Sequence, residues 1–133
     1  MSEKKIYKTA YSFQDLDVYQ SLYKAMVTVL TKVIPQLPKE EKYDLVDQLR
    51  RSCKAPPALI AEGYAKKNYQ KDWLKYLNDA IGECNEMIVH LSCCRDVYDK
   101  HVDSILCQEL IKIYDICGKQ LFRLGQSWQK RPT

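Results

Sequence analysis

The sequence predicts an all-α protein that folds as an antiparallel, up-down four-helix bundle. Four segments carry apolar residues mostly at spacings of three and four, the rhythm of helices that bury one face in a bundle. Only four glycines and five prolines occur in 133 residues, which leaves little room for a sandwich of short strands. The polar connections between the segments are short, and short connections make neighbouring helices run in opposite directions.

The first helix is expected over residues 15–34. Asp15 is a suitable N-cap, because its carboxylate can accept a hydrogen bond from a backbone N–H of the first turn. Pro35 and Pro38 end the helix. The residues expected to face the core are Leu16, Tyr19, Tyr23, Met26, Leu30 and Val33.

The second helix is expected over residues 38–63, with a break near Pro56. Pro38 suits the first turn of a helix. The Pro56-Pro57 pair is expected to break the helix, because a proline inside a helix deletes one backbone hydrogen bond and clashes with the preceding turn, at a cost of about 3 kcal/mol. The expected inner face consists of Tyr43, Val46, Leu49 and Cys53, continued beyond the prolines by Leu59 and Ile60.

The third and fourth helices are expected over residues 69–97 and 104–128, and Asp103 or Ser104 can cap the fourth. The third has the cleanest apolar row in the chain: Trp73, Leu77, Ala80, Cys84, Met87, Leu91 and Cys94. The row of the fourth is Leu106, Leu110, Ile113, Cys117, Leu121, Leu124 and Trp128. Gly82 interrupts the third helix, where we expect it to permit a close helix approach or a subunit contact.

The chain divides into a flexible basic arm over residues 1–12, a bundle over 13–128 and a basic tail over 129–133. No apolar run approaches the roughly 18–20 residues that a membrane span needs, and no apolar signal region follows the N-terminus. We therefore expect a cytoplasmic protein whose six cysteines are reduced. Cys84 and Cys94 fall on an expected inner face, as Cys117 does, so a structural role is favoured over a redox or metal role.

Basic residues concentrate in residues 50–75, where seven cations stand with two acids, although the whole chain has a net charge of only +4. Such segregation can form a face that attracts a polyanion, or it can simply keep the surface solvated. Tyr64 and Tyr69 alternate with lysines there, a mixture suited to stacking on bases and pairing with phosphates, although loop tyrosines more often cover a core edge. The candidate nucleic-acid-binding residues are Arg50, Arg51, Lys54, Lys66, Lys67 and Lys71.

Patterns typical of catalysis or metal binding are weak. His90 lies three and four residues before Cys93 and Cys94, but a structural zinc site takes four ligands, usually from two such pairs. Glu83 and Glu86 fall outside the core row and lack the Glu-x-x-His spacing of a di-metal bundle. No Gly-rich phosphate loop or nucleophile elbow occurs in the sequence. We therefore expect no enzyme, no catalytic residue, no metal site and no cofactor.

Several motifs together resemble a known family. Residues 13–19 read Phe-Gln-Asp-Leu-Asp-Val-Tyr, and residues 38–45 read Pro-Lys-Glu-Glu-Lys-Tyr-Asp-Leu. They are followed by Gln-Leu-Arg-Arg at 48–51, Ile-Ala-Glu-Gly at 60–63, Trp-Leu-Lys-Tyr-Leu at 73–77 and Ala-Ile-Gly at 80–82. From Phe13 to about Trp128 the chain is similar to the four-helix-bundle family of the 23S rRNA intervening-sequence proteins, which is related to the accessory proteins of diversity-generating retroelements.

Two departures from the family pattern are visible. The family commonly has Ser-Ile-Pro-x-Asn before Ile-Ala-Glu-Gly, where this chain has Ala-Pro-Pro-Ala-Leu at residues 55–59. A family serine after Gly82 is replaced by Glu83. Any role that rests on the missing serine and asparagine does not carry over to this chain.

The resemblance implies a cytoplasmic bundle that assembles into a ring, typically a homopentamer. Members of the retroelement branch are basic pentameric barrels that bind a reverse transcriptase and nucleic acid. The leading hypothesis is a non-enzymatic oligomer that associates with RNA, a ribonucleoprotein or single-stranded DNA with low sequence specificity. The alternatives are a protein-only interaction scaffold, an accessory subunit of a retroelement reverse transcriptase and, less favoured, a metal or redox protein that uses the cysteines.

Overall fold

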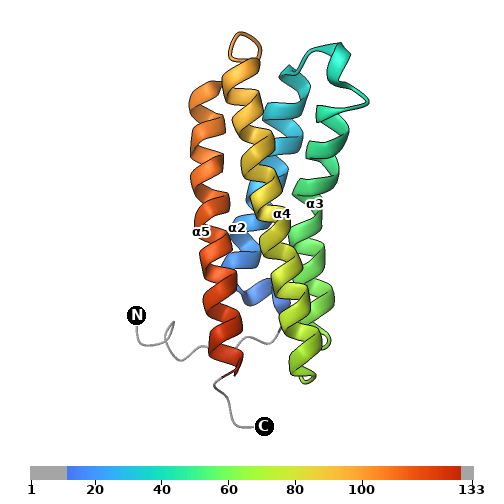
Figure 1. Cartoon of the computed structure of the whole chain (residues 1–133), viewed down its shortest axis with the longest axis vertical. Coiled ribbons are helices and arrows are strands. Elements are labelled where there is room, and N and C mark those ends of the chain that lie inside the picture. Colours follow the sequence, from blue (N-terminus) through green and yellow to red (C-terminus); the bar gives the residue numbers. More distant parts are fainter. Residues whose placement is uncertain (1–11, 130–133) are drawn as a thin grey trace.

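The structure is a computed structural model that describes residues 12–129, and in that range the chain is all-α (Figure 1). The long helices are α2 (Asp17–Thr28, continued by the π-helical turn η2, Val29–Val33), α3 (Leu45–Tyr64), α4 (Gln70–Val97) and α5 (Ser104–Gln129). The 3-10 turns are η1 (Phe13–Asp15), η3 (Ile34–Gln36) and η4 (Lys39–Glu41). The predicted all-α fold with four helices and no strand is confirmed for the described residues. The predicted arm and tail lie outside them, except for Ser12 and Gln129.

The four helices lie side by side along the long axis of the molecule (Figure 1). Helix α4 packs against both α3 and α5, and α2 packs against the same two helices. Residues 65–69 connect α3 to α4 at one end, and residues 98–103 connect α4 to α5 at the other. Among the described helices, none is both long enough and apolar enough to cross a membrane.

The first helix begins later than predicted, because the cap belongs to a preceding turn. Ser12, not Asp15, is the capping residue: its hydroxyl accepts a hydrogen bond from the Gln14 N–H at 3.2 Å, and its own N–H donates to the Asp15 carboxylate at 3.1 Å. This capping box closes η1, and α2 starts only at Asp17. Pro35 lies in η3, where the helix ends as predicted.

The buried face of α2 is rotated from the predicted one. The side chains that reach the core are Val18, Leu22, Ala25, Val29 and Val33. Of the predicted row only Val33 is fully buried, and Tyr23 is 47% exposed. The change of buried face has a chemical reason. A buried tyrosine hydroxyl needs a hydrogen-bond partner, whereas small and aliphatic side chains allow α2 to approach α3 and α5 without any such partner.

The second helix differs from the prediction at both its start and its prolines. Residues 39–41 form a 3-10 turn and α3 begins only at Leu45, so the predicted inner residue Tyr43 is 86% exposed. The predicted break does not occur, because α3 runs continuously through Pro56 and Pro57. Both rings are buried in the bundle, and this burial of apolar surface offsets the backbone hydrogen bonds that prolines cannot make.

The buried face of α4 matches its prediction completely, although the helix begins at Gln70, one residue later than predicted, and α5 matches in part. All seven predicted residues of α4 are its buried residues. The buried residues of α5 are Cys107, Leu110, Tyr114, Cys117, Leu121 and Gly125, whereas the predicted Ile113 is 37% exposed. Asp103 caps α5, since its carboxylate accepts a hydrogen bond from the Leu106 N–H at 3.0 Å. Gly82 is exposed and an added Cβ would meet nothing within 4 Å, so no close approach within the protomer explains it.

Helices α3 and α4 approach most closely at Gly63. A Cβ added to this glycine would lie 2.5 Å from the Tyr76 Cβ and 2.9 Å from Cε3 of Trp73. The Trp73 ring is fully buried and makes edge-to-face contacts with Tyr64 at 6.0 Å and with Trp128 at 5.8 Å between ring centroids. This aromatic layer closes one end of the core.

We predict that Gly63→Ala destabilises the protein by about 1–3 kcal/mol, because the added methyl forces α3 away from α4. Gly118→Ala on α5 is the matched control, because an added Cβ there would meet nothing within 4 Å. It should raise the free energy of unfolding by about 0.5–1 kcal/mol by removing a flexible residue from a helix. Urea unfolding followed by circular dichroism measures both. Equal effects of the two substitutions would contradict the close approach at Gly63.

The other end of the bundle is tied together by Glu41. One carboxylate oxygen accepts a hydrogen bond from the Leu45 N–H at 3.2 Å, at the start of α3. The other accepts a short hydrogen bond from the hydroxyl of Tyr98, just after α4. The Glu41 carboxylate raises the pKa of Tyr98 to about 12, because the hydrogen bond and the negative charge both favour the neutral phenol.

We predict that Tyr98→Phe lowers the melting temperature at pH 7 by a few degrees. The folded state raises the pKa of Tyr98, so its stabilisation is complete below the unfolded value near 10 and is lost as the pH rises towards about 12. The difference between wild type and variant should therefore shrink over that interval. Tyr43→Phe, at an exposed position, serves as the control. It should leave the melting temperature unchanged, both at pH 7 and over the interval from about pH 10 to about pH 12.

Candidate nucleic-acid interface

The six predicted nucleic-acid-binding residues fall into two groups. Arg50, Arg51 and Lys54 lie on α3 and are called the α3 group. Lys66, Lys67 and Lys71 lie in and just after the connection between α3 and α4 and are called the connection group. A rise of about 1.5 Å per residue places Arg51 roughly 20 Å from the C-terminal end of α3. The structure therefore does not merge the two groups into one compact site.

All three residues of the α3 group are exposed. Arg50 and Arg51 are consecutive and diverge by about 100° around the helix, which agrees with their both avoiding the core. An acidic neighbour from α4 accompanies them. Partial burial, together with the charge of Glu86, raises the pKa of Glu83, and the positive charge of Arg51 works against this rise. Arg51 of the α3 group thus lies near a carboxylate of α4.

The backbone of the connection group is held by several hydrogen bonds. The Lys66 N–H donates to the Gly63 carbonyl at 2.8 Å, and the Tyr69 N–H donates to the Lys66 carbonyl at 2.9 Å. Helix α5 fastens the same connection, because the indole N–H of Trp128 donates to the Lys67 carbonyl at 3.0 Å. These contacts fix where the lysine side chains leave the backbone.

The lysines of this connection differ in their surroundings. The Lys66 ammonium donates to the Tyr76 hydroxyl at 3.2 Å, which in turn donates to the Glu62 carboxylate at 3.0 Å. The bond to Tyr76 raises the pKa of Lys66, so its positive charge is maintained. Lys67 is half-buried, with its ammonium 4.4 Å from the centre of the Tyr64 ring. Lys71 is exposed on the first turn of α4.

Only one of the two candidate stacking tyrosines is available to a ligand. Tyr64 is 9% exposed and packs against Trp73, so its ring belongs to the core. Tyr69 is 69% exposed and lies between Lys66 and Lys71 in the sequence. A base could stack on Tyr69 while phosphates contact the neighbouring ammonium groups.

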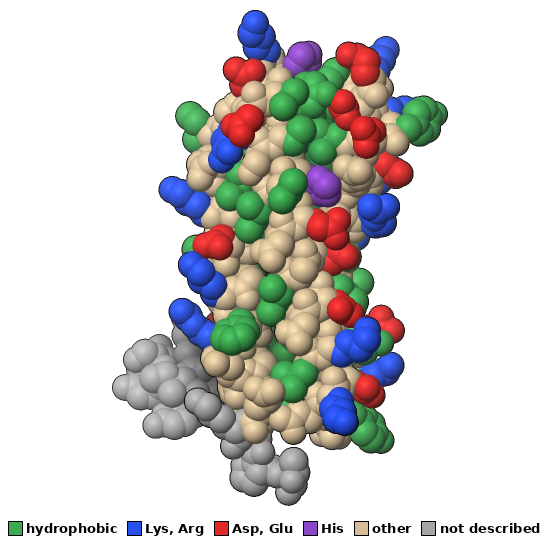
Figure 2. Space-filling model, viewed as in Figure 1, with side chains coloured by type: hydrophobic (Ala, Val, Ile, Leu, Met, Phe, Trp, Pro, Cys, Tyr) green, Lys and Arg blue, Asp and Glu red, His purple; other side chains and the backbone are tan. Residues whose placement is uncertain are grey.

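The face of the molecule drawn in Figure 2 does not carry one continuous basic surface. Figure 2 shows Lys and Arg side chains interspersed with Asp and Glu on the face that contains α4 and α5. Two examples are the ion pairs of Lys75 with Asp79 at 3.0 Å and of Lys119 with Asp115 at 3.2 Å. On this face the cations therefore form only local groups.

The residues considered for metal chemistry are dispersed. Within residues 12–129, no three His, Cys, Asp or Glu side chains are placed to hold a metal ion. Cys94 is fully buried, whereas Cys93 and His90 are half-buried, and His90 has Glu86 at 3.8 Å.

Sequence reasoning missed the residues that hold the connection group in place. Tyr76 links Lys66 to Glu62, and Trp128 reaches Lys67 from the far end of the chain. The periodicity of α4 places Tyr76 beside the buried Trp73 row, which indicates a position near α3 but not the hydroxyl contacts. The pairing of Trp128 with residue 67 has no local signal.

The sequence was compared with known proteins. The family model described as 23S rRNA-intervening sequence protein matches residues 14–123. No curated protein matches the chain, and no solved structure matches it.

Proposed function

This chain belongs to the family of 23S rRNA-intervening sequence proteins, and we propose that it is a non-enzymatic, oligomeric helical-bundle protein that associates with nucleic acid. The proposed ligand is RNA, alone or in a ribonucleoprotein, or single-stranded DNA. The observation that carries the proposal is the connection group, where exposed Lys66 and Lys71 flank exposed Tyr69 on a hydrogen-bonded segment. The family description supports RNA as the first ligand to test.

The chemistry of these side chains implies binding with low sequence specificity. A lysine ammonium contacts phosphate, which every nucleotide carries, and a tyrosine ring can stack on any base. The α3 group, roughly 20 Å along the bundle, could contact the same strand farther on. Base-edge recognition by a bidentate side chain is not required for this mode of binding.

We further infer that successive helices run antiparallel, as the short connections 65–69 and 98–103 suggest, and that protomers assemble into a ring, a homopentamer as the family resemblance implies. Exposed apolar side chains on α4 and α5 support assembly: Val89, Val97, Ile105, Ile116 and Phe122. Exposed Gly82 is suited to a close subunit contact. A ring would repeat the net charge of +4 and so strengthen the field that attracts a polyanion.

A protein-only scaffold is the second candidate function. The observation that favours it is the pairing of cations with acids, as in Lys75 with Asp79 and Lys66 with Glu62 through Tyr76. Such pairs reduce the net field available to a polyanion. An accessory subunit of a retroelement reverse transcriptase would combine both functions, with a protein partner and a nucleic acid. The free thiols of all six cysteines support a cytoplasmic location for either function.

We predict that the wild-type protein binds a structured RNA hairpin or a single-stranded DNA oligonucleotide at low salt. Three phosphate contacts to a single strand imply about 20-fold weaker binding when salt rises from about 50 to 200 mM. Fluorescence anisotropy of labelled RNA and DNA measures both affinities. The triple substitution Lys66→Glu, Lys67→Glu and Lys71→Glu should abolish binding while leaving helicity unchanged.

The matched control reverses three exposed lysines elsewhere, Lys24→Glu, Lys32→Glu and Lys112→Glu, which alters the net charge equally. Retained binding by the control, with loss in the connection-group variant, would assign binding to the connection. Equal loss in both would show that only overall charge matters. Absence of wild-type binding at about 50 mM salt would leave the protein-only scaffold as the function.

We predict that light scattering at micromolar concentration gives a mass that is a multiple of 15.6 kDa, five-fold for the pentamer. Gly82→Leu should lower this mass, because a bulky side chain would hold the neighbouring subunit away. Lys24→Leu is the control, since it adds the same side chain to an exposed position of α2. A wild-type mass of 15.6 kDa would rule out the ring.

A further inference from the structure

Two cysteines face each other where α4 ends and α5 begins. Cys94 lies in the last turn of α4 and Cys107 in the first turn of α5, and both side chains are 0% exposed. Each thiol is the largest influence on the pKa of the other. The two residues are therefore neighbours in space across the 98–103 connection.

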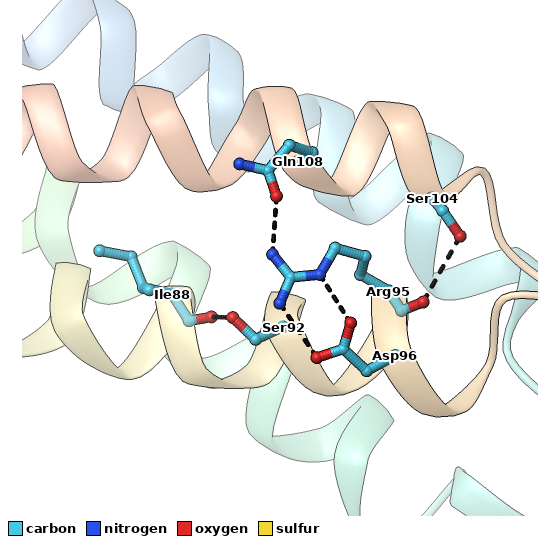
Figure 3. Close-up of polar contacts among 6 residues, drawn as sticks. All are labelled: Ile88, Ser92, Arg95, Asp96, Ser104 and Gln108. Atoms are coloured by element: carbon cyan, nitrogen blue, oxygen red, sulfur yellow. Dashed lines mark hydrogen bonds and ion pairs between the residues drawn. The ribbon is translucent and has the colours of Figure 1, made fainter.

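The positions of the two thiols are fixed by contacts on the adjacent turns. The guanidinium of Arg95 donates to the side-chain oxygen of Gln108 at 2.6 Å, and the Ser104 hydroxyl donates to the Arg95 carbonyl at 3.5 Å (Figure 3). Each of these bonds joins the end of α4 to the beginning of α5. The first of them joins Arg95 and Gln108, the residues that directly follow the two cysteines.

The register of the two helices agrees with this pairing over most of their length. Trp73 precedes Cys94 by the same number of residues as Trp128 follows Cys107, and the two indole rings are 5.8 Å apart. The same relation holds for Cys84 and Cys117, whose thiols interact electrostatically. Cys94 and Cys107 are thus an in-register pair across the α4–α5 seam.

The chain contains a second cysteine pair that provides an internal comparison. Cys84 and Cys117 lie deeper in the core, where burial raises the pKa of their thiols to about 12 and about 11. At the end of the bundle, the interaction with the Cys94 thiol lowers the pKa of Cys107, and the interaction with Cys107 raises the pKa of Cys94. A thiolate is the form that reacts with oxidants, so Cys107 is the more reactive sulfur.

We propose that Cys94 and Cys107 are a modification site, at which a peroxide oxidises the two thiols to a disulfide that links α4 to α5. The Cys107 sulfur attacks one oxygen of hydrogen peroxide, the O–O bond breaks and hydroxide leaves, which gives a sulfenic acid. The Cys94 sulfur then attacks the Cys107 sulfur, the S–O bond breaks, and the oxygen leaves as water. Two thiols and one peroxide become one disulfide and two waters, and a dithiol reductant reverses the change.

Access to the buried pair requires a local opening. The 98–103 connection lies at the end of the bundle, and the ends of helices open more readily than a core. Once formed, the disulfide closes a short loop and restricts the unfolded chain. The oxidised protein should therefore be more stable than the reduced protein. This inference does not depend on nucleic-acid binding or on assembly.

The test uses the full-length protein, reduced and then treated with hydrogen peroxide. After denaturation in urea, free cysteines are alkylated and the protein is examined by intact mass and peptide mapping. We expect two fewer alkylated cysteines, a Cys94–Cys107 linked peptide and an increase of about 10 °C in melting temperature. Dithiothreitol should restore six alkylated cysteines.

Substitutions distinguish this pair from the other thiols. Cys94→Ala should abolish the link, whereas the double substitution Cys84→Ala and Cys117→Ala should preserve it. Direct mapping of the wild type supplies the answer if a core substitution prevents folding. Six alkylatable cysteines after peroxide treatment, a link through any other pair or between copies, or oxidation to sulfinic acid without a link would each overturn the proposal.

Discussion

The burial of one row of side chains on α4 is the constraint on which the rest of the bundle depends. From Trp73 to Cys94, every residue of this row is at most 1% exposed, and the row packs between α3 and α5. Because the row is continuous, it fixes the register of both neighbours. Gly63 allows α3 to approach at one end of the row, and the Arg95–Gln108 contact joins α5 to it at the other. Helix α2 then covers the two helices beside α4.

The features that local patterning controls could be predicted from the sequence. The α4 row alternates strictly between spacings of three and four, and all seven of its residues were predicted correctly. Helix α2 carries two adjacent apolar rows, one rich in tyrosine and one in valine and leucine. Periodicity alone cannot choose between them, because the choice depends on how closely α3 and α5 approach. The continuous path of α3 through Pro56-Pro57 likewise depends on the surrounding core.

The candidate binding site was predictable only in its composition. The sequence places cations at 50–54 and 66–71, but it does not show that Tyr64 turns into the core or that Glu83 lies near Arg51. Both facts arise from pairing between helices. The distance of roughly 20 Å between Arg51 and the end of α3 also follows only once the helix is known to be unbroken. The identity of a ligand depends on surfaces outside the chain, so it cannot be predicted from this sequence.

The two proposed sites lie at opposite ends of α4, which makes their functions separable. Lys71 is in the first turn of this helix and Cys94 in the last, about 35 Å apart at a rise of about 1.5 Å per residue. A disulfide between Cys94 and Cys107 adds no charge near the connection group and leaves Tyr69 exposed. Oxidation can therefore influence nucleic-acid binding only through global stability or subunit packing. In an isolated protomer the affinity should not change, and any change in an oligomer would locate the effect at contacts between subunits.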